Sequence, residues 1–355
     1  MKIWITTKNS ILTEPPPEHP EFLVAYHFAQ KWLNGAEEFS LKTSGSTGIP
    51  KIITIRRNQL AVSARMTATA LDLPGGSRCL ICLNVEYIAG LMMVVRSLVM
   101  DWEMTFVEPS SNPLLIPELS KPFDFLALVP LQLSAICGNE TSRARLEACG
   151  KVLVGGAPVS QTLLTETRKL SVPVYQSYGM TETVSHVALR RLNAPVLEED
   201  YTFLPEIDFG TDDRQCLFVR GEVTDFQLVQ TNDLVEITSE RTFKWIGRLD
   251  SIINSGGLKI QLDKIDQKME ECWPNDTPLL PFFSWFEPDD RLGQKLIVFV
   301  EGEKNSVIEK KILHTLSQKV KPFEVPKAFY FIHEIIKTPT GKLNKPATAD
   351  LFFTK

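Results

Sequence analysis

Between residues 78 and 176, short apolar runs typical of strands alternate with longer runs typical of helices. The strand-like runs are 78–83, 104–107, 125–129, 151–154 and 172–176, and the helical runs between them are 88–100, 130–136 and 160–169. This alternation predicts an α/β fold with a mainly parallel sheet. Ligands of such folds bind at the carboxyl ends of the strands, so the loops that follow these strands are the first candidates for a site.

The pattern changes after residue 208, where strand-like runs become short and are separated by turns. The runs at 217–220, 225–228, 234–238 and 243–246 indicate a small antiparallel or barrel-like subdomain. A compact α+β segment follows, with helical runs at 261–272 and 307–319 and strand-like runs at 295–300 and 328–332. We therefore predict a large N-terminal domain, residues 1–249, and a small C-terminal domain, residues 250–355, that meet at Asp250. Residues 1–37 suggest an irregular lead-in with one helix at 21–33.

Composition limits the partners of the chain. Its 355 residues carry a net charge of −5, which gives no basic surface for nucleic acid, so an anionic ligand must be held by local cations. The most apolar stretch, 88–95, ends at Arg96 and is too short to cross a bilayer, and no signal peptide is expected. Cys79 and Cys82 form a C-x-x-C in a strand-like run, where they would lie on opposite faces as buried hydrophobes. A reducing cytoplasm fits this cysteine usage.

The loop at residues 43–51 is dense in hydroxyls and glycines and ends in a lysine. It reads Thr43, Ser44, Gly45, Ser46, Thr47, Gly48, Ile49, Pro50 and Lys51. Glycine lets backbone N–H groups approach an anion closely and lysine supplies charge, so this composition suits phosphate oxygens, although the spacing is not that of a Walker A loop. A surface turn between the strand-like runs 38–42 and 52–56 is the alternative, and the other motifs decide between the two.

Two further loops follow predicted strands of the parallel sheet. Gly155, Gly156 and Ala157 follow the run 151–154, where glycines leave room for a flat ring, although a tight turn would also need them. The second loop contains Ser177, Tyr178, Gly179, Met180, Thr181 and Glu182. Its tyrosine can stack on a base, a threonine hydroxyl can contact a phosphate, and the glutamate can bind Mg²⁺. A helix start capped by Thr181 is the alternative.

Several residues nearer the C-terminus either belong to a functional site or are ordinary surface and turn residues. Asp233 and Arg248 lie near strand ends and either bind ribose hydroxyls or are simply solvated charges. Gly256, Gly257 and Lys259 fit the turn of an ordinary hairpin. Lys342 lies in a turn-rich loop, where it is either functional or a surface charge.

Taken in order, these segments resemble the adenylate-forming superfamily of acyl-CoA synthetases, luciferases and peptide-synthetase adenylation domains. The motifs are T-S-G-S-T-G-x-P-K, G-G-A-P, Y-G-M-T-E, T-x-D, G-R-x-D, S-G-G-x-K-I and P-T-G-K, from about residue 41 to residue 345. The resemblance implies a ligase that uses ATP and Mg²⁺ to form an acyl-adenylate and then transfers the acyl group to CoA. It also implies that the small C-terminal domain is mobile about a hinge, here Asp250.

The resemblance assigns roles to individual residues. The loop 43–51 would hold the ATP phosphates, Thr181 the α-phosphate and Glu182 the Mg²⁺ ion. Lys342 would bridge the carboxylate and the α-phosphate during adenylation. The adenine and ribose would lie against Gly155, Gly156, Ala157, Ser177, Tyr178, Gly179, Asp233 and Arg248. The channel for the CoA thiol would be lined by Gly256, Gly257 and Lys259.

The chain is short for this superfamily, because the phosphate loop already begins at residue 43. Compact members include the o-succinylbenzoate–CoA ligases of menaquinone biosynthesis, in which a His-x-x-Gly and a following arginine lie on the helix after the second core strand. Tyr87, Gly90 and Arg96 match this pattern, with Tyr87 in place of the histidine. Ser185 and His186, which come just after Glu182, are further candidates for the acyl pocket.

Arg96 lies on an apolar helix, where an unpaired charge would be costly to bury. Its partner is either the second carboxylate of o-succinylbenzoate or an internal acid such as Glu86 or Asp101. We therefore predict an o-succinylbenzoate–CoA ligase. The alternatives are a CoA ligase for another aryl or short acyl acid and an adenylation domain that loads a carrier protein.

Overall fold

A computed structural model describes residues 3–42, 52–119, 121–274, 276–338 and 343–354. The α-helices are α1 (Lys8–Thr13), α2 (Pro20–Leu33), α3 (Arg57–Ala70), α4 (Ile88–Met100), α5 (Pro130–Cys137), α6 (Glu140–Glu147), α7 (Gln161–Thr167), α8 (Leu262–Cys272), α9 (Ser306–Ser317) and α10 (Lys345–Phe353). The 3₁₀ turns are η1 (Pro113–Leu115), η2 (Thr181–Thr183), η3 (Glu222–Thr224), η4 (Leu249–Ser251) and η5 (Pro322–Glu324).

The strands form one large sheet and two smaller ones. They are β1 (Ile3–Thr6), β2 (Glu38–Lys42), β3 (Ile52–Arg56), β4 (Arg78–Ile81), β5 (Glu103–Val107), β6 (Phe125–Leu128), β7 (Lys151–Val154), β8 (Val174–Gly179), β9 (His186–Arg191), β10 (Tyr201–Phe203), β11 (Asp208–Thr211), β12 (Cys216–Arg220), β13 (Val229–Ile237), β14 (Thr242–Arg248), β15 (Ile252–Ser255), β16 (Leu258–Gln261), β17 (Phe282–Asp289), β18 (Gly293–Glu301) and β19 (Ala328–Ile332).

The large sheet is mixed rather than mainly parallel. Its twelve described strands run in the order β1-β5-β4-β6-β7-β8-β9-β10-β14-β13-β12-β11. Only the block β5-β4-β6-β7-β8 is parallel, and β9 turns back antiparallel to β8. The predicted α/β class is therefore confirmed, but the short strands after residue 200 do not form a separate sheet. They continue the large one, because β9 and β10 connect it to β14.

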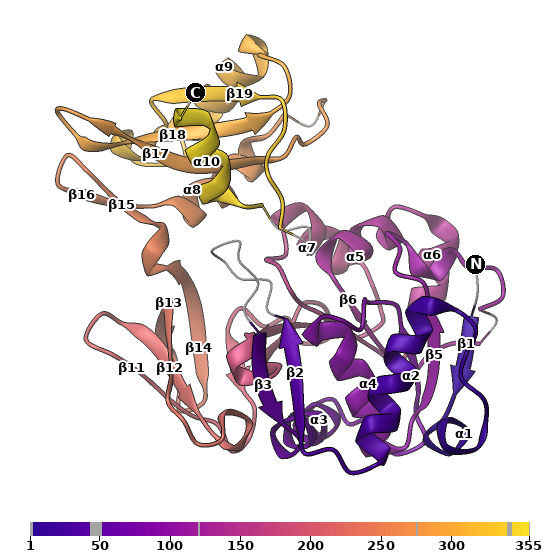
Figure 1. Cartoon of the computed structure of the whole chain (residues 1–355). Coiled ribbons are helices and arrows are strands. Elements are labelled where there is room, and N and C mark those ends of the chain that lie inside the picture. Colours follow the sequence, from indigo (N-terminus) through magenta and orange to yellow (C-terminus); the bar gives the residue numbers. More distant parts are fainter. Residues whose placement is uncertain (1–2, 43–51, 120, 275, 339–342, 355) are drawn as a thin grey trace.

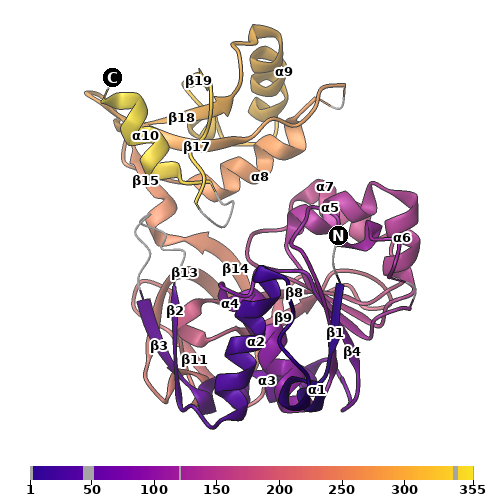
Figure 2. The same ribbon diagram turned by 45° about the vertical axis from the view of Figure 1, so that its right-hand side comes forward.

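Helices cover both faces of the parallel block, as Figures 1 and 2 show. Successive residues of a strand point to opposite faces, so Cys79 of β4 packs with α2, α3 and α4, whereas Leu80 packs with α5, α6 and α7. Cys79 and Cys82 accordingly lie in different clusters, and both are buried free cysteines. This confirms the prediction that they are core residues on opposite sides of the sheet.

Two parts of the prediction for the N-terminal residues and the short strands were wrong. The first residues are not an irregular lead-in, since β1 is the edge strand of the large sheet and pairs antiparallel with β5. The run 225–228 is not a strand either. Asp225 and Phe226 have φ values of 52° and 57°, in the left-handed region, so the chain turns there instead of extending.

The chain after Arg248 forms a second unit above the large sheet in Figures 1 and 2. It contains a five-stranded sheet in the order β16-β15-β18-β17, with β19 parallel to β18. Helices α8 and α9 pack on it in one cluster of apolar residues, and α10 in another. The predicted boundary residue, Asp250, lies in η4 between β14 and β15; the division into two domains stays a prediction.

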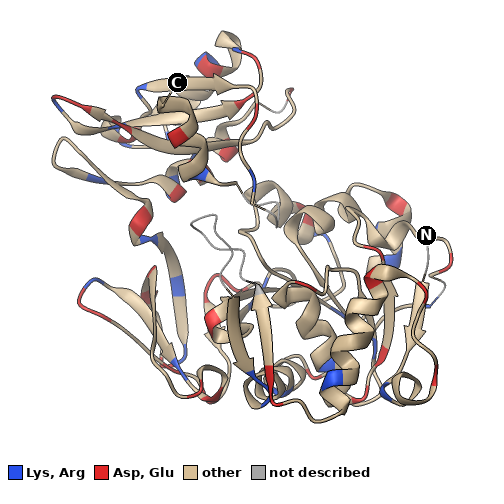
Figure 3. Ribbon diagram, in the orientation of Figure 1, with Lys and Arg blue, Asp and Glu red and all other residues tan. Residues whose placement is uncertain are grey.

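Charged residues of both signs are scattered over the elements of both units in Figure 3. This agrees with the small net charge of −5. Within the described ranges, no helix combines the length and the apolar character that a membrane span needs.

Candidate active site

The predicted loops meet at the carboxyl ends of β7 and β8, which are neighbours in the parallel block. Gly155 follows β7, and a Cβ atom at this position would lie 2.3 Å from Ser177 Oγ on β8, so any other residue would displace that hydroxyl. Ser177 Oγ in turn donates a hydrogen bond to the carbonyl of Val154 at 3.2 Å. Gly156 has a φ of +85°, which glycine adopts without strain. Gly155 thus leaves room for the Ser177 hydroxyl, and Gly156 provides the positive φ of this turn.

A tight turn connects β8 to β9. A Cβ atom at Gly179 would lie 2.2 Å from the carbonyl oxygen of Ser185, so the two strands approach each other more closely than any other residue would allow. The turn is held by Thr183, whose hydroxyl accepts from the N–H of Met180 at 3.0 Å. A 3₁₀ turn does begin at Thr181, but its N-cap residue is Met180, so the alternative that Thr181 is the cap is wrong. Glu182 is exposed.

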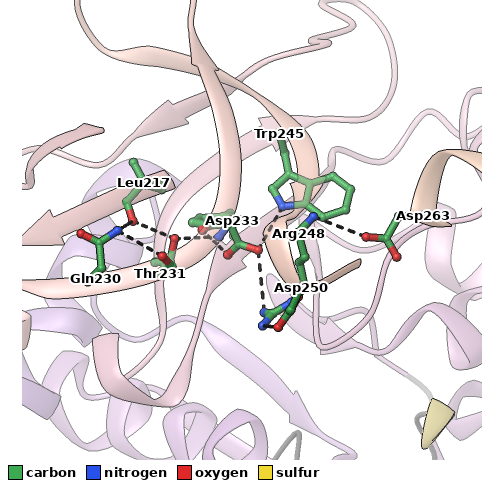
Figure 4. A network of polar contacts seen from close by, with 9 residues as sticks. Leu217, Gln230, Thr231, Asp233, Trp245, Arg248, Asp250 and Asp263 are labelled. Carbon is green, nitrogen blue, oxygen red and sulfur yellow. Dashed lines mark hydrogen bonds and ion pairs between the residues drawn. The ribbon is translucent and has the colours of Figure 1, made fainter. Parts of the chain in front are cut away.

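Asp233 is the centre of a polar network on β13, where this strand pairs with the last residue of β14 (Figure 4). Its Oδ2 accepts from the hydroxyl of Tyr178 at 2.6 Å, and its Oδ1 accepts from Trp245 Nε1 at 3.3 Å. Arg248 is its partner across β13 and β14, with Nη1 3.8 Å from Oδ1. Burial and the neighbouring Asp233 carboxylate raise the pKa of Tyr178. The structure thus brings together three residues that lie far apart in the sequence and that were predicted to contact the nucleoside.

Arg248 also connects this network to the second unit. Its Nε and Nη2 donate to the carboxylate of Asp250 at 2.8 and 2.6 Å, a bidentate pair. These hydrogen bonds lower the pKa of Asp250 and raise that of Arg248. The backbone N–H of Arg248 donates to Asp263 on α8 at 3.4 Å (Figure 4). The sequence had given no indication of Trp245 or Asp263, since neither belongs to one of the motifs.

A second polar cluster lies inside the protein around Arg96. Arg96 is only 2% exposed, although it is on the apolar helix α4. Its Nε donates to Thr67 Oγ1 at 3.2 Å and its Nη2 to Ser185 Oγ at 2.8 Å. His186 contacts both of these hydroxyls, with Nε2 3.3 Å from Thr67 Oγ1 and Nδ1 3.3 Å from Ser185 Oγ. Three predicted residues of the acid site, Arg96, Ser185 and His186, therefore lie together.

No described carboxylate pairs with Arg96. Asp101, one of the two internal acids considered, lies 3.4 Å from Lys8 instead. The other, Glu86, is exposed in the loop before α4, whereas Arg96 is buried. Burial lowers the pKa of Arg96 to about 10, and the side chain stays a cation at neutral pH. The protein thus buries a positive charge with neutral partners only, among the residues that the structure describes.

The other residue predicted for the acid site, Tyr87, does not belong to this cluster. It is the N-cap residue of α4, and its side chain makes no capping hydrogen bond. Arg96 lies nine positions further along the chain, which is about 13 Å along a helix. Gly90 is required for packing, because a Cβ atom there would lie 2.3 Å from the carbonyl oxygen of Asn84.

The predicted residues of the thiol channel form the tip of a hairpin. Gly256 and Gly257, with φ values of +61° and +83°, make the two-residue turn between β15 and β16. A turn of this kind needs positive φ at both central positions, which explains both glycines without reference to a ligand. Lys259 is exposed on β16.

Two predicted segments lie outside the described residues. One is the loop 43–51, which includes Thr43, Ser44, Gly45, Ser46, Thr47, Gly48 and Lys51; the other includes Lys342. Their flanks are described: β2 and β3 pair antiparallel from Glu38↔Arg56 to Lys42↔Ile52, within the predicted bounds of both strands. Lys337 and Leu343 pair across the second segment.

The described residues contain no group of three His, Cys, Asp or Glu side chains that could hold a metal ion by itself. Magnesium does not need such a group. It keeps several of its waters and is usually bound by one or two carboxylates together with the phosphates of a substrate. A single exposed carboxylate, Glu182, fits that mode of binding.

The fold and these clusters define an α/β enzyme with a polar site at the carboxyl ends of the central strands. Comparison with known proteins gives the family. Residues 41–207 match the AMP-binding enzyme family. The crystal structure of an acyl-CoA synthetase (AMP-forming)/AMP-acid ligase II-like protein from Dyadobacter fermentans is 49% identical, covers 99% of both chains and superposes with a TM-score of 0.69. The chain belongs to the adenylate-forming family of AMP-forming acid–thiol ligases.

More distant relatives have more specific names. A 2-succinylbenzoate–CoA ligase from Bacillus cytotoxicus is 27% identical over 86% of this chain and 70% of its own length. The structure of o-succinylbenzoate coenzyme A synthetase from Bacillus subtilis, in complex with ATP and magnesium ion, covers 88% of this chain and 69% of that one. Its TM-score is 0.72 at 20% identity, so this likeness supports the fold alone.

Proposed function

We propose that this protein converts o-succinylbenzoate, ATP and CoA to o-succinylbenzoyl-CoA, AMP and diphosphate. The observation that carries the choice of acid is the buried Arg96, which has hydroxyl partners and no described carboxylate. A buried charge is costly unless it is paired. An acid with two carboxylates supplies the missing partner with one while the other reacts. The names of the relatives at about 27% identity agree with this choice.

The chemistry starts from the poor electrophilicity of a carboxylate. In the first step its oxygen attacks the α-phosphorus of ATP, and diphosphate leaves. Negative charge crowds this centre, so Lys342 and Thr181 would act by positioning and electrostatic stabilisation, each contact being worth about 3–4 kcal/mol. Glu182 would hold Mg²⁺, which neutralises phosphate charge when bound. In the second step the CoA thiol attacks the acyl carbonyl, and AMP leaves.

The nucleoside would lie against the edge formed by Gly155–Ala157 and Ser177–Gly179. The carboxylate of Asp233, which is 8% exposed, is the acceptor that ribose hydroxyls would use, and Arg248 lies beside it. The loop 43–51 would hold the outer phosphates. Asp250 would be the hinge about which the second unit moves, with Gly256, Gly257 and Lys259 at the thiol channel after that movement.

Two alternatives differ from this proposal, one in the acid and one in the acceptor of the acyl group. A CoA ligase for another aryl or short acyl acid would not need a cation at Arg96 for a second carboxylate. An adenylation domain would transfer the acyl group to a phosphopantetheinyl carrier protein instead of free CoA. Product formation with free CoA and with a holo-carrier protein separates these two classes of acceptor.

ATP–diphosphate exchange tests the proposed acid. We expect o-succinylbenzoate to support exchange, and Arg96→Met to raise its KM at least about 100-fold, because a charge-assisted pair in a buried site is lost. The KM for ATP should stay within about 2-fold of the wild type. Exchange that does not depend on o-succinylbenzoate but depends strongly on another acid would refute the proposal.

The control for this experiment is Arg190→Met. Arg190 also has neutral partners, with Nε 2.9 Å from Gln176 Oε1 and Nη1 3.0 Å from the carbonyl of Glu199. It belongs to β9 but not to the Arg96 cluster, so its replacement should leave the KM for the acid unchanged. If both variants raise that KM equally, the effect of Arg96→Met is a general loss of structure.

A further inference from the structure

His186 closes a ring of four polar side chains inside the protein. Arg96 donates to Thr67 and to Ser185, and His186 contacts both of these hydroxyls through its two ring nitrogens. Thr67 is 0% exposed and His186 5%. The ring connects α3, α4, the turn between β8 and β9, and the first residue of β9.

A hydrogen bond outside the ring fixes the direction of every bond within it. The hydroxyl of Thr67 donates to the carbonyl of Ser63, one helical turn earlier, at 2.9 Å. A hydroxyl has one proton, so Thr67 can only accept from its other two neighbours. His186 must then carry its proton on Nε2 and donate it to Thr67. Its Nδ1 is the acceptor for the hydroxyl of Ser185.

This arrangement needs a neutral imidazole, since a protonated one would have no acceptor for Ser185. Burial and the nearby charge of Arg96 both lower the pKa of His186 well below its ordinary value. The neutral form is therefore the one present at physiological pH. The backbone supports the placement, because Val184, two residues earlier, is held at a φ of 66° and Gly179 lies directly against His186 Cα.

The ring does not use all the hydrogen-bond donors of the Arg96 guanidinium. Nε and Nη2 are engaged by the two hydroxyls, and Nη1 meets only the sulfur of Met93 at 3.7 Å among the described residues. A thioether is a weak acceptor and does not satisfy a guanidinium N–H group. Nη1, which has no strong acceptor among the described residues, can therefore donate to a bound anion, as can the second proton of Nη2.

We propose that His186 is a positioning residue of the acid site, which holds Thr67 and Ser185 as acceptors and thereby presents Nη1 of Arg96 to the second carboxylate of the substrate. This inference rests on the proposed function, because it takes the acid to be a dicarboxylate. His186 itself does not touch the reacting atoms.

Two substitutions separate the contacts of His186. The amide of His186→Asn lies where Nδ1 was and can still accept from Ser185, whereas His186→Gln reaches toward Thr67 and loses Ser185. His186→Leu loses both contacts. We expect His186→Gln to raise the KM for o-succinylbenzoate about 10-fold, the equivalent of the one hydrogen bond to Ser185, and His186→Leu to raise it at least as much. His186→Asn should stay within about 3-fold of the wild type. His314→Leu, which replaces an exposed histidine of α9, is the control.

The readout is ATP–diphosphate exchange with o-succinylbenzoate and with the two analogues that each lack one carboxylate. The expected change affects the KM of the dicarboxylate, while kcat and the KM for ATP change less than about 2-fold. The KM of the analogue that still reacts but lacks the second carboxylate should stay unchanged. Loss of kcat and of all KM values together would show that His186 only maintains the structure, and would overturn the inference.

The outcomes also separate this inference from the proposed function. A wild-type enzyme that shows no preference for the dicarboxylate overturns both. A wild-type enzyme with that preference, combined with equal KM values in His186→Asn and His186→Gln, overturns the inference alone. This comparison remains available if His186→Leu does not fold, because the two amide variants keep a polar side chain in the ring.

Discussion

The ion pair between Lys345 and Asp266 should contribute measurably to the stability of the C-terminal unit. Lys345 begins α10, and its Nζ lies 2.7 Å from Asp266 Oδ2 and 3.6 Å from Asp263 Oδ1, both on α8. The other oxygen of Asp266 accepts from the backbone N–H of Ser284 at 2.5 Å. Burial opposes the charge of Lys345, but the charges of Asp266 and Asp263 outweigh it and raise its pKa. The pair therefore joins α10, α8 and β17.

The magnitude follows from the exposure of the pair. The side chains of Lys345 and Asp266 are 26% and 22% exposed. Fully exposed pairs contribute at most about 1 kcal/mol, whereas removing one partner of a fully buried pair costs about 3–5 kcal/mol. For a pair that is about three quarters buried we expect Lys345→Met to cost about 2 kcal/mol, since it leaves Asp266 charged and without its cation. That free energy corresponds to a factor of about 30 in an opening equilibrium.

Native-state hydrogen exchange measures this cost locally. Amides of α8 and α10 should lose protection by about 30-fold in Lys345→Met, while those of α3 and α4 stay unchanged. Lys311→Met is the matched control, because its pair with Asp276 has side chains 50% and 67% exposed and should be worth less than about 0.5 kcal/mol. The double variant Lys345→Met/Asp266→Leu should recover only part of the loss, because Asp266→Leu also leaves the buried N–H of Ser284 without its acceptor. Equal protection in Lys345→Met and in the control would refute this reasoning.

Two further predictions concern the proposed chemistry and the turn after β8. Lys342→Ala should reduce adenylate formation about 10²–10³-fold but largely spare thioester formation from supplied acyl-adenylate, measured as separate half-reactions; equal losses in both would contradict the proposed role. Gly179→Ala should lower the free energy of unfolding by about 1–3 kcal/mol, because its Cβ would lie 2.2 Å from the carbonyl oxygen of Ser185 and force β8 and β9 apart. Gly75→Ala, where the nearest atom is at 3.4 Å, is the control in thermal unfolding, and a similar effect of both substitutions would contradict the steric argument.

The sequence predicted the parallel block because its strands and helices differ clearly in length and period. The bounds of β7 and α4 agree with the prediction to the residue. The sequence did not predict strand β9. The run from His186 to Arg191 follows a motif-rich loop and shows no alternation of polar and apolar residues. Without β9, the later strands look like a separate unit. With it, they extend the large sheet, because β9 turns back beside β8 and pairs with β10.

The site was predictable only where a motif marks it. Asp233 and Arg248 each looked like an isolated charge, and their pairing became visible only when β13 and β14 were seen to be neighbours. Thr67 gave no signal at all, since a threonine among apolar residues on a helix is ordinary in a core. Its hydroxyl matters because α3 and α4 pack against each other and place it 3.2 Å from Arg96 Nε. Such contacts depend on tertiary packing, which a local pattern does not encode.

The cost of burying Arg96 is itself an argument for a ligand. Replacing a buried ion pair by apolar residues of similar volume is often neutral or stabilises a protein by about 1–4 kcal/mol, and a buried charge without an ionic partner is more costly than a pair. If Arg96 served only the fold, a methionine in its place would perform that task better, because the surrounding residues of α4 are apolar. Two hydroxyls compensate for part of the lost hydration, but hydroxyls do not neutralise the charge. An anion would supply the full compensation, and because the cluster lies next to the β8–β9 turn, that anion would be close to the proposed nucleotide site.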